Sequence, residues 1–104
     1  MNSKTKGIKK ERFLEMYEAI LSVETLDECI RLMDDICSVT ELRAMEQRYQ
    51  VARMLNAGHV YSTILEHTGA SSATISRVNR SLQYGADGYE VVFNRLDKKK
   101  AENG

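Results

Sequence analysis

Apolar residues recur at spacings of three and four along most of this chain, which is the pattern of one buried face of an α-helix. Six segments show it, at about 9–22, 26–37, 41–56, 61–68, 72–83 and 89–98. The sequence contains no proline, and its glycines fall at the ends of these segments or between them. Because proline and glycine interrupt helices most strongly, the pattern predicts an all-α fold of six helices.

The fourth and fifth segments predict two short helices joined by a sharp turn. Gly69 is able to adopt the left-handed conformation that such a turn needs, and Ser71 or Ser72 supplies a hydroxyl that caps the second helix. The residues expected to point inward are Ile64 and Leu65 in the first helix and Ile75, Val78 and Leu82 in the second. The pair is typical of a helix-turn-helix, which lays its second helix in the DNA major groove, but it also fits an ordinary helical hairpin.

The opposite face of the second helix favours DNA binding over an ordinary hairpin. It carries small residues and two arginines: Ser72, Ala73, Ser76, Arg77 and Arg80. Small side chains let a helix approach base edges closely, and arginine binds both guanine and phosphate. One position departs from the usual pattern, because a small residue is usual where the two helices cross and Leu65 stands there.

The remaining helices are expected to pack through apolar faces. Thr25 and Glu28 form a capping box before the second helix, and Thr40 is the expected cap of the third. The first helix presents Phe13, Leu14, Tyr17, Ile20 and Leu21, and the last presents Tyr89, Val92, Phe93 and Leu96. The third is apolar around much of its surface, so it needs two partners, and in so short a chain one of them is expected to be another subunit.

A chain of 104 residues with 42% apolar content supports a single domain. We expect a disordered basic tail at 1–7, one helical DNA-binding domain at 8–98 with the helix-turn-helix at about 60–83, and a frayed tail at 99–104. No apolar run approaches the roughly 20 residues of a membrane span, and no secretory signal is present. We therefore expect no membrane association and a cytoplasmic location.

Charge is balanced overall but unevenly placed. The chain holds 15 basic and 15 acidic residues, so its net charge is zero. Residues 13–40 hold one basic and seven acidic residues, whereas residues 41–84 hold five basic and three acidic. This distribution indicates a dimer with an acidic body and weakly basic DNA-binding ends, and we expect modest affinity for random DNA.

Metal and catalytic chemistry are not indicated. Cys29 and Cys37 would lie about 12 Å apart on one helix, too far for a disulfide, and are expected to be buried in a reducing compartment. His59 and His67 have no cysteine or carboxylate at ligand spacing, which disfavours a zinc site. No nucleophile-and-base arrangement or nucleotide-binding loop is present, so we expect no metal, no catalytic residues and no enzyme activity.

The run from Gly69 to Arg77, GASSATISR, resembles the reading unit of the Trp repressor superfamily. The closer resemblance is to the TrpR-like YerC/YecD family of bacterial proteins, through the segments at 19–37, 47–58, 68–85 and 87–96. The match covers nearly the whole chain apart from its two charged ends. It implies an all-α, six-helix, Trp-repressor-like fold and an intertwined homodimer with one DNA-binding head per subunit.

The resemblance also implies which residues contact double-stranded DNA. By match to the family's reading helix, these are Ser71, Ser72, Ala73, Thr74 and Ser76. Arg80 is added because its side chain can reach a guanine or a phosphate. The resulting hypothesis is a transcriptional regulator, specifically a repressor, that binds a near-palindromic operator as a homodimer. The alternative is a helical, dimeric protein-interaction module without autonomous DNA binding, which the zero net charge favours.

A ligand pocket is implied by the same resemblance. Arg77 and Ser81 match residues that contact tryptophan in Trp repressor, and Arg48 matches a second arginine if a one-residue gap precedes the turn. Val78 replaces a glycine beside the indole ring, so its isopropyl group would occupy part of the slot. We therefore expect weak or no tryptophan binding and no other cofactor, with a different small effector as the alternative. Arg77 is then expected to pair with a carboxylate inside the head.

Overall fold

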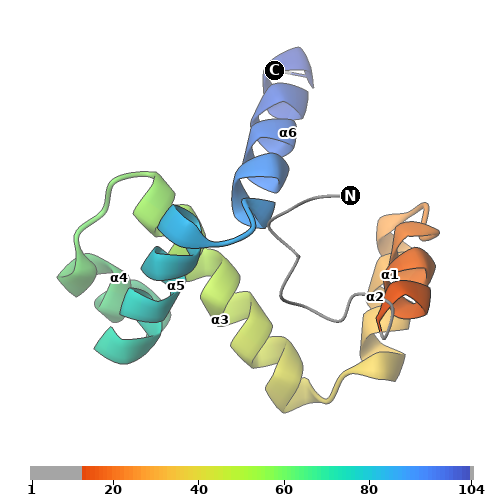
Figure 1. Ribbon diagram of the computed structural model, residues 1–104, viewed down its shortest axis with the longest axis horizontal. Coiled ribbons are helices and arrows are strands. Elements are labelled where there is room, and N and C mark those ends of the chain that lie inside the picture. Colours follow the sequence, from red (N-terminus) through yellow and green to blue (C-terminus); the bar gives the residue numbers. More distant parts are fainter. Residues whose placement is uncertain (1–12, 104) are drawn as a thin grey trace. The chain divides into compact units, whose positions relative to one another are not determined.

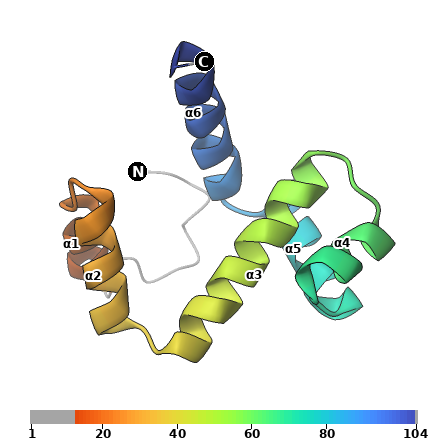
Figure 2. The same cartoon turned by 180° about the vertical axis from the view of Figure 1, so that it is seen from behind.

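The computed structural model describes residues 13–103, and this part of the chain contains six α-helices and no β-strand (Figures 1 and 2). The helices are α1 (Leu14–Leu21), α2 (Leu26–Ile36), α3 (Val39–Asn56), α4 (Tyr61–Thr68), α5 (Ser72–Tyr84) and α6 (Gly88–Asn103). The prediction of an all-α fold with six helices is confirmed. The expected basic tail at 1–7 lies outside the described residues.

The chain divides into two compact units, and the division falls within α3. The first unit ends at Ala44 and contains α1, α2 and the start of α3. The second begins at Met45 and contains the rest of α3 together with α4, α5 and α6. The second unit therefore contains both helices of the predicted helix-turn-helix.

Thr25 caps α2 as predicted. Its hydroxyl oxygen accepts a hydrogen bond from the Glu28 backbone N–H at 3.1 Å. The Glu28 carboxylate accepts from the Glu24 N–H at 3.0 Å, whereas a capping box would have paired it with the Thr25 N–H. The start of α2 is therefore held by two side-chain bonds, with the second shifted by one residue.

Ser38, and not Thr40, caps α3. The Ser38 hydroxyl oxygen accepts from the Glu41 N–H at 3.1 Å, and the Glu41 carboxylate accepts from the Ser38 N–H at 2.8 Å. This reciprocal capping box starts α3 at Val39, two positions before the expected start. Because the Ser38 backbone and hydroxyl stabilise the ionised carboxylate, they lower the pKa of Glu41 below its ordinary value.

Most apolar side chains of α1 and α2 are exposed among the described residues. Neither helix contains a buried residue, and the whole predicted stripe of α1 is exposed. Cys29 is also exposed and Cys37 is half-buried, so the prediction that both are buried is wrong for Cys29. Both thiols are free. Most helical stability comes from packing an amphipathic face, and no residue of these two helices is fully buried among the described residues.

The core of the second unit lies where α3, α4, α5 and α6 meet. Its buried members are Val51, Ala52, Ile64, Ala70, Ile75, Val78 and Phe93. Tyr49, Met54, Leu55, Leu82 and Tyr89 pack against them. The inward orientation predicted for Ile64, Ile75 and Val78 is confirmed. These buried residues fix how α4 and α5 are rotated, and therefore which of their faces meet solvent.

Phe93 anchors α6 on α3. Its ring packs edge-on against Tyr49, with the ring centroids 5.7 Å apart. The guanidinium carbon of Arg53 lies 4.9 Å from the centre of the Phe93 ring, and its Nη1 lies 3.6 Å from a carboxylate oxygen of Asp97. One arginine thus combines a cation–π contact with an ion pair, and both join the same two helices.

The rest of α6 differs from its predicted form. Val92 and Leu96 are exposed, so only part of the expected apolar stripe faces the core. The helix also runs to Asn103, beyond the expected end at Lys98, because no glycine or proline interrupts it before Gly104. No helix among the described residues has the length and apolar character needed to cross a membrane.

Candidate nucleic-acid interface

α4 and α5 pack against each other and are joined by a turn at Gly69 (Figures 1 and 2). Gly69 has a φ of 71°, in the left-handed region, and its N–H donates to the Leu65 carbonyl at 2.9 Å. A side chain at this φ would be strained, so the predicted role of glycine is confirmed. Leu65 is 45% exposed, which corrects the prediction that it points inward. The small residue that is buried near this turn is Ala70, and position 65 does not take that role.

Two polar side chains, on α3 and at the end of α4, hold this turn. The Thr68 hydroxyl donates to the Ile64 carbonyl at 2.7 Å and accepts from the Ala70 N–H at 3.1 Å. The Gln47 side chain on α3 donates to the Thr68 carbonyl at 3.1 Å. Threonine before a helix-ending glycine is a local signal that could have indicated the first pair of bonds. Nothing local indicates Gln47, because its partner is 21 residues away.

The start of α5 is capped by Ser71, as predicted. Its hydroxyl oxygen accepts from the Thr74 N–H at 3.1 Å, and the hydroxyl donates to Thr74 Oγ1 at 3.1 Å. The first turn of α5 contains no acidic residue, so the partial positive charge of the helix terminus is not neutralised there. Such a terminus is suited to binding an anion, including a backbone phosphate.

The predicted DNA-contacting residues lie on one surface of α5. Five of them are exposed: Ser71, Ser72, Ala73, Ser76 and Arg80. Thr74 is half-buried beside the cap. Since Ile75 and Val78 point into the core, the exposed residues form the opposite side of the helix. The structure therefore brings the six predicted residues together at the N-terminal end and outer face of one helix.

Arg77 lies beside this surface, and among the described residues it does not form the ion pair that the sequence led us to expect. Its side chain is exposed, and the ion pairs within residues 13–103 do not include it. The expected carboxylate partner is missing because Glu66 is the one acidic residue between Tyr61 and Tyr84, and it is exposed as well. Arg77 therefore adds a second exposed arginine to the outer side of α5.

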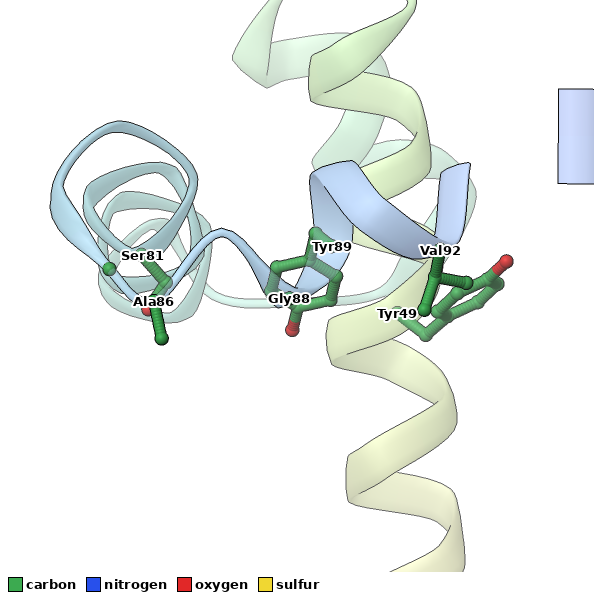
Figure 3. A pocket seen from close by; sticks show the side chains of 7 residues that line it. Tyr49, Ser81, Ala86, Gly88, Tyr89 and Val92 are labelled. Atoms are coloured by element: carbon green, nitrogen blue, oxygen red, sulfur yellow. The ribbon is translucent and has the colours of Figure 1, made fainter. Parts of the chain in front are cut away.

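The four residues proposed for an effector pocket do not all line the cavity found in the second unit. Val78 is 2% exposed and fills space in the core, so it does not line a slot. A cavity of about 450 Å³ opens in the second unit, and Ser81 is the only one of the four that lines it (Figure 3). Arg48 and Arg77 are exposed elsewhere. Within the described residues, no three potential metal ligands come together.

These features define an all-helical protein with the architecture of a DNA-binding regulator. The sequence model of the Trp repressor protein family matches residues 11–97. The chain therefore belongs to the Trp repressor family, a family of DNA-binding regulators, and the resemblance predicted from its sequence is confirmed.

Three relatives support this assignment. The chain is 45% identical over 89 residues to YerC of Bacillus subtilis (strain 168), described as an uncharacterized protein, with 86% of each chain covered. It shares 42% identity and a TM-score of 0.82 with a candidate Trp repressor from Staphylococcus aureus, covering 89% of this chain and 93% of that one. A TrpR-like protein from Eubacterium eligens shares 47% identity and a TM-score of 0.82, with 88% and 95% covered.

Proposed function

We propose that this protein is a sequence-specific transcriptional regulator, acting as a repressor, that binds double-stranded DNA through a helix-turn-helix formed by α4 and α5. The observation that carries the proposal is the outer surface of α5, which combines small side chains and exposed arginines with a helix start free of acidic residues. Family membership supports the same function. Because the core residues of α4 and α5 point inward, this surface faces solvent.

The parts of this surface suit different parts of a duplex. The N-terminus of α5 suits a backbone phosphate, which would set the register of the helix. Ala73 and Ser76 are small enough to allow the helix to approach base edges in the major groove. Arg77 and Arg80 are long enough to contact a guanine or a phosphate. We propose no tryptophan corepressor, because Val78 is buried in the core and neither Arg48 nor Arg77 lines the cavity of the second unit.

We also propose that the active form is a homodimer. The supporting observation is that α1 and α2 have amphipathic sequences but no buried residue in the part of the chain that the structure describes. A second copy would cover these faces and supply the packing that the helices lack. Two reading helices related by a two-fold axis would then enter successive major grooves, about 34 Å apart.

Arg80→Ala is expected to weaken binding to a selected duplex by about 1–3 kcal/mol, the usual contribution of an arginine contact to a base. Fluorescence anisotropy across a salt series measures the effect. If Arg80 contacts a base, discrimination between sites is lost; if it contacts a phosphate, affinity falls for all sequences and the salt slope decreases by about one unit.

Arg95→Ala, which removes an exposed arginine from α6, is the matched control and should leave binding unchanged. Equal affinities for the wild type and Arg80→Ala would contradict the assignment of α5. Absence of any salt-dependent binding by the wild type would support the alternative, a dimeric protein-interaction module.

Ile30→Asp is expected to convert the dimer into a monomer. Ile30 lies on the apolar face of α2 and is half exposed in the single chain, so a carboxylate there would be desolvated on dimerisation. We expect the dimer dissociation constant to rise at least about 100-fold, which corresponds to about 3 kcal/mol. Sedimentation equilibrium measures it.

Val60→Asp, which places the same charge on an exposed apolar position before α4, is the control and should remain dimeric. A wild-type chain that sediments as a monomer at tens of micromolar would contradict the dimer proposal.

A further inference from the structure

The cavity in the second unit lies where the end of α5 meets the start of α6. Its lining residues come from α3, α5, α6 and the turn between the last two: Tyr49, Ser81, Gly85, Ala86, Gly88, Tyr89 and Val92 (Figure 3). The volume of about 450 Å³ falls within the range of about 300–1,000 Å³ that is usual for small-molecule sites. It is too small to admit a helix, which is about 10–12 Å wide with its side chains.

The chemistry of the lining selects an uncharged ligand. No charged side chain lines the cavity, so an ionised or zwitterionic molecule would find no side-chain ion pair there. Two tyrosine rings and Val92 provide apolar surface, and aromatic rings favour stacked or edge-on contacts with a planar ring. The Ser81 hydroxyl is exposed and is the side-chain group that α5 offers for one hydrogen bond.

Gly85 and Gly88 both line the cavity, but steric conflict excludes a side chain only at Gly85. A Cβ at Gly85 would collide with the Ser81 carbonyl oxygen, so only glycine lets the turn close against the last turn of α5. A Cβ at Gly88 would meet no heavy atom within 4 Å, and its φ is not positive. The backbone therefore does not require glycine at position 88, and the missing side chain leaves the cavity open.

We propose that this cavity binds an uncharged, planar aromatic small molecule. The site differs from the one expected from the family resemblance, with which it shares only Ser81. It uses tyrosine rings and glycine backbone where that site would use two arginines. The proposal does not depend on DNA binding, because it can be tested on the protein alone.

The test uses two fluorescent probes with the same ring skeleton. N-phenyl-1-naphthylamine is uncharged, whereas 8-anilino-1-naphthalenesulfonate carries a sulfonate. We expect saturable binding of the neutral probe at one site per chain and at least tenfold weaker binding of the sulfonate. Gly88→Phe should fill the cavity and weaken binding of the neutral probe at least tenfold, while Gly88→Ala should change it less than threefold.

Two further variants keep the test decisive. Val92→Phe narrows the cavity from α6 and replaces Gly88→Phe if that variant is unfolded by circular dichroism. Leu65→Ala removes an exposed apolar side chain from the head and should leave probe binding unchanged. The proposal is overturned if the wild type shows no saturable binding, which would also be the result if a second copy fills the cavity. It is likewise overturned if both probes bind equally, or if the variants that fill the cavity bind the neutral probe like the wild type.

Discussion

Phe93→Ala is expected to destabilise the second unit by about 3–5 kcal/mol, the usual cost of removing a buried phenylalanine ring. Phe93 is 2% exposed, packs against Tyr49 and Tyr89, and receives the guanidinium of Arg53 over its ring. Its loss would leave a void between α3 and α6 and remove the cation–π contact. Since small domains have only about 5–15 kcal/mol of total stability, much of the folded population would be lost at physiological temperature.

Urea unfolding followed by circular dichroism measures this effect, with all variants at one protein concentration because the proposed dimer makes stability concentration-dependent. Tyr84→Ala is the matched control, since this aromatic side chain is 81% exposed. Its cost should stay within about 0.5 kcal/mol, as for most surface substitutions. A cost below about 1 kcal/mol for Phe93→Ala would show that α6 is not anchored through this ring.

Ala73→Glu is expected to abolish specific DNA binding without destabilising the fold. Ala73 is exposed in the first turn of α5, where a longer, negative side chain would meet base edges and phosphates. We expect affinity to fall at least about 100-fold, which is about 3 kcal/mol. Stability should be unchanged or higher by about 0.3–1 kcal/mol, because an acidic residue is favourable near a helix N-terminus.

Ala101→Glu introduces the same charge and side chain on an exposed position of α6. It should leave DNA affinity within about twofold, so that the comparison separates the position of the charge from its effect on net charge. Duplex titration and thermal unfolding of both variants complete the experiment. Undiminished binding by Ala73→Glu would place the DNA-binding surface somewhere other than α5.

Local sequence signals were sufficient for most of the helix boundaries. Thr25 and Ser71 accept the capping bonds that their positions predict, and Gly58 and Gly69 both adopt the left-handed conformation after a helix. Such signals work because each cap is formed by residues within four positions of one another. Ser38 was missed in favour of Thr40 because both can cap, and the reciprocal bond with Glu41 decides between them.

Contacts between residues far apart in the sequence could not be predicted from such local signals. The Gln47 bond to the Thr68 carbonyl joins two helices, and no periodic pattern encodes it. Cys29 shows a related limit. Its position on the apolar face of α2 predicts burial, but Cys29 is exposed and α2 has no buried residue among those described. An apolar pattern identifies a surface that requires a partner without stating whether the same chain supplies it.

One part of the candidate site could be predicted from the sequence and another part could not. The exposed face of α5 follows from helical periodicity once Ile75 and Val78 are placed in the core, so its residues could be predicted from sequence. The ligand-binding set could not, because it depends on which side chains converge in space. Of that set, Ser81 alone lines the cavity beside Gly85 and Gly88.

The most direct test of the central claim is selection of the purified protein on randomised duplex DNA at low salt, with and without tryptophan. We predict enrichment of one near-palindromic sequence whose half-sites lie one helical turn apart, about 10–10.5 base pairs between centres, as expected for two symmetric reading helices. The same sequence should be recovered under both conditions. A requirement for tryptophan would contradict the proposed absence of a corepressor, and no enrichment under either condition would contradict DNA reading by α5.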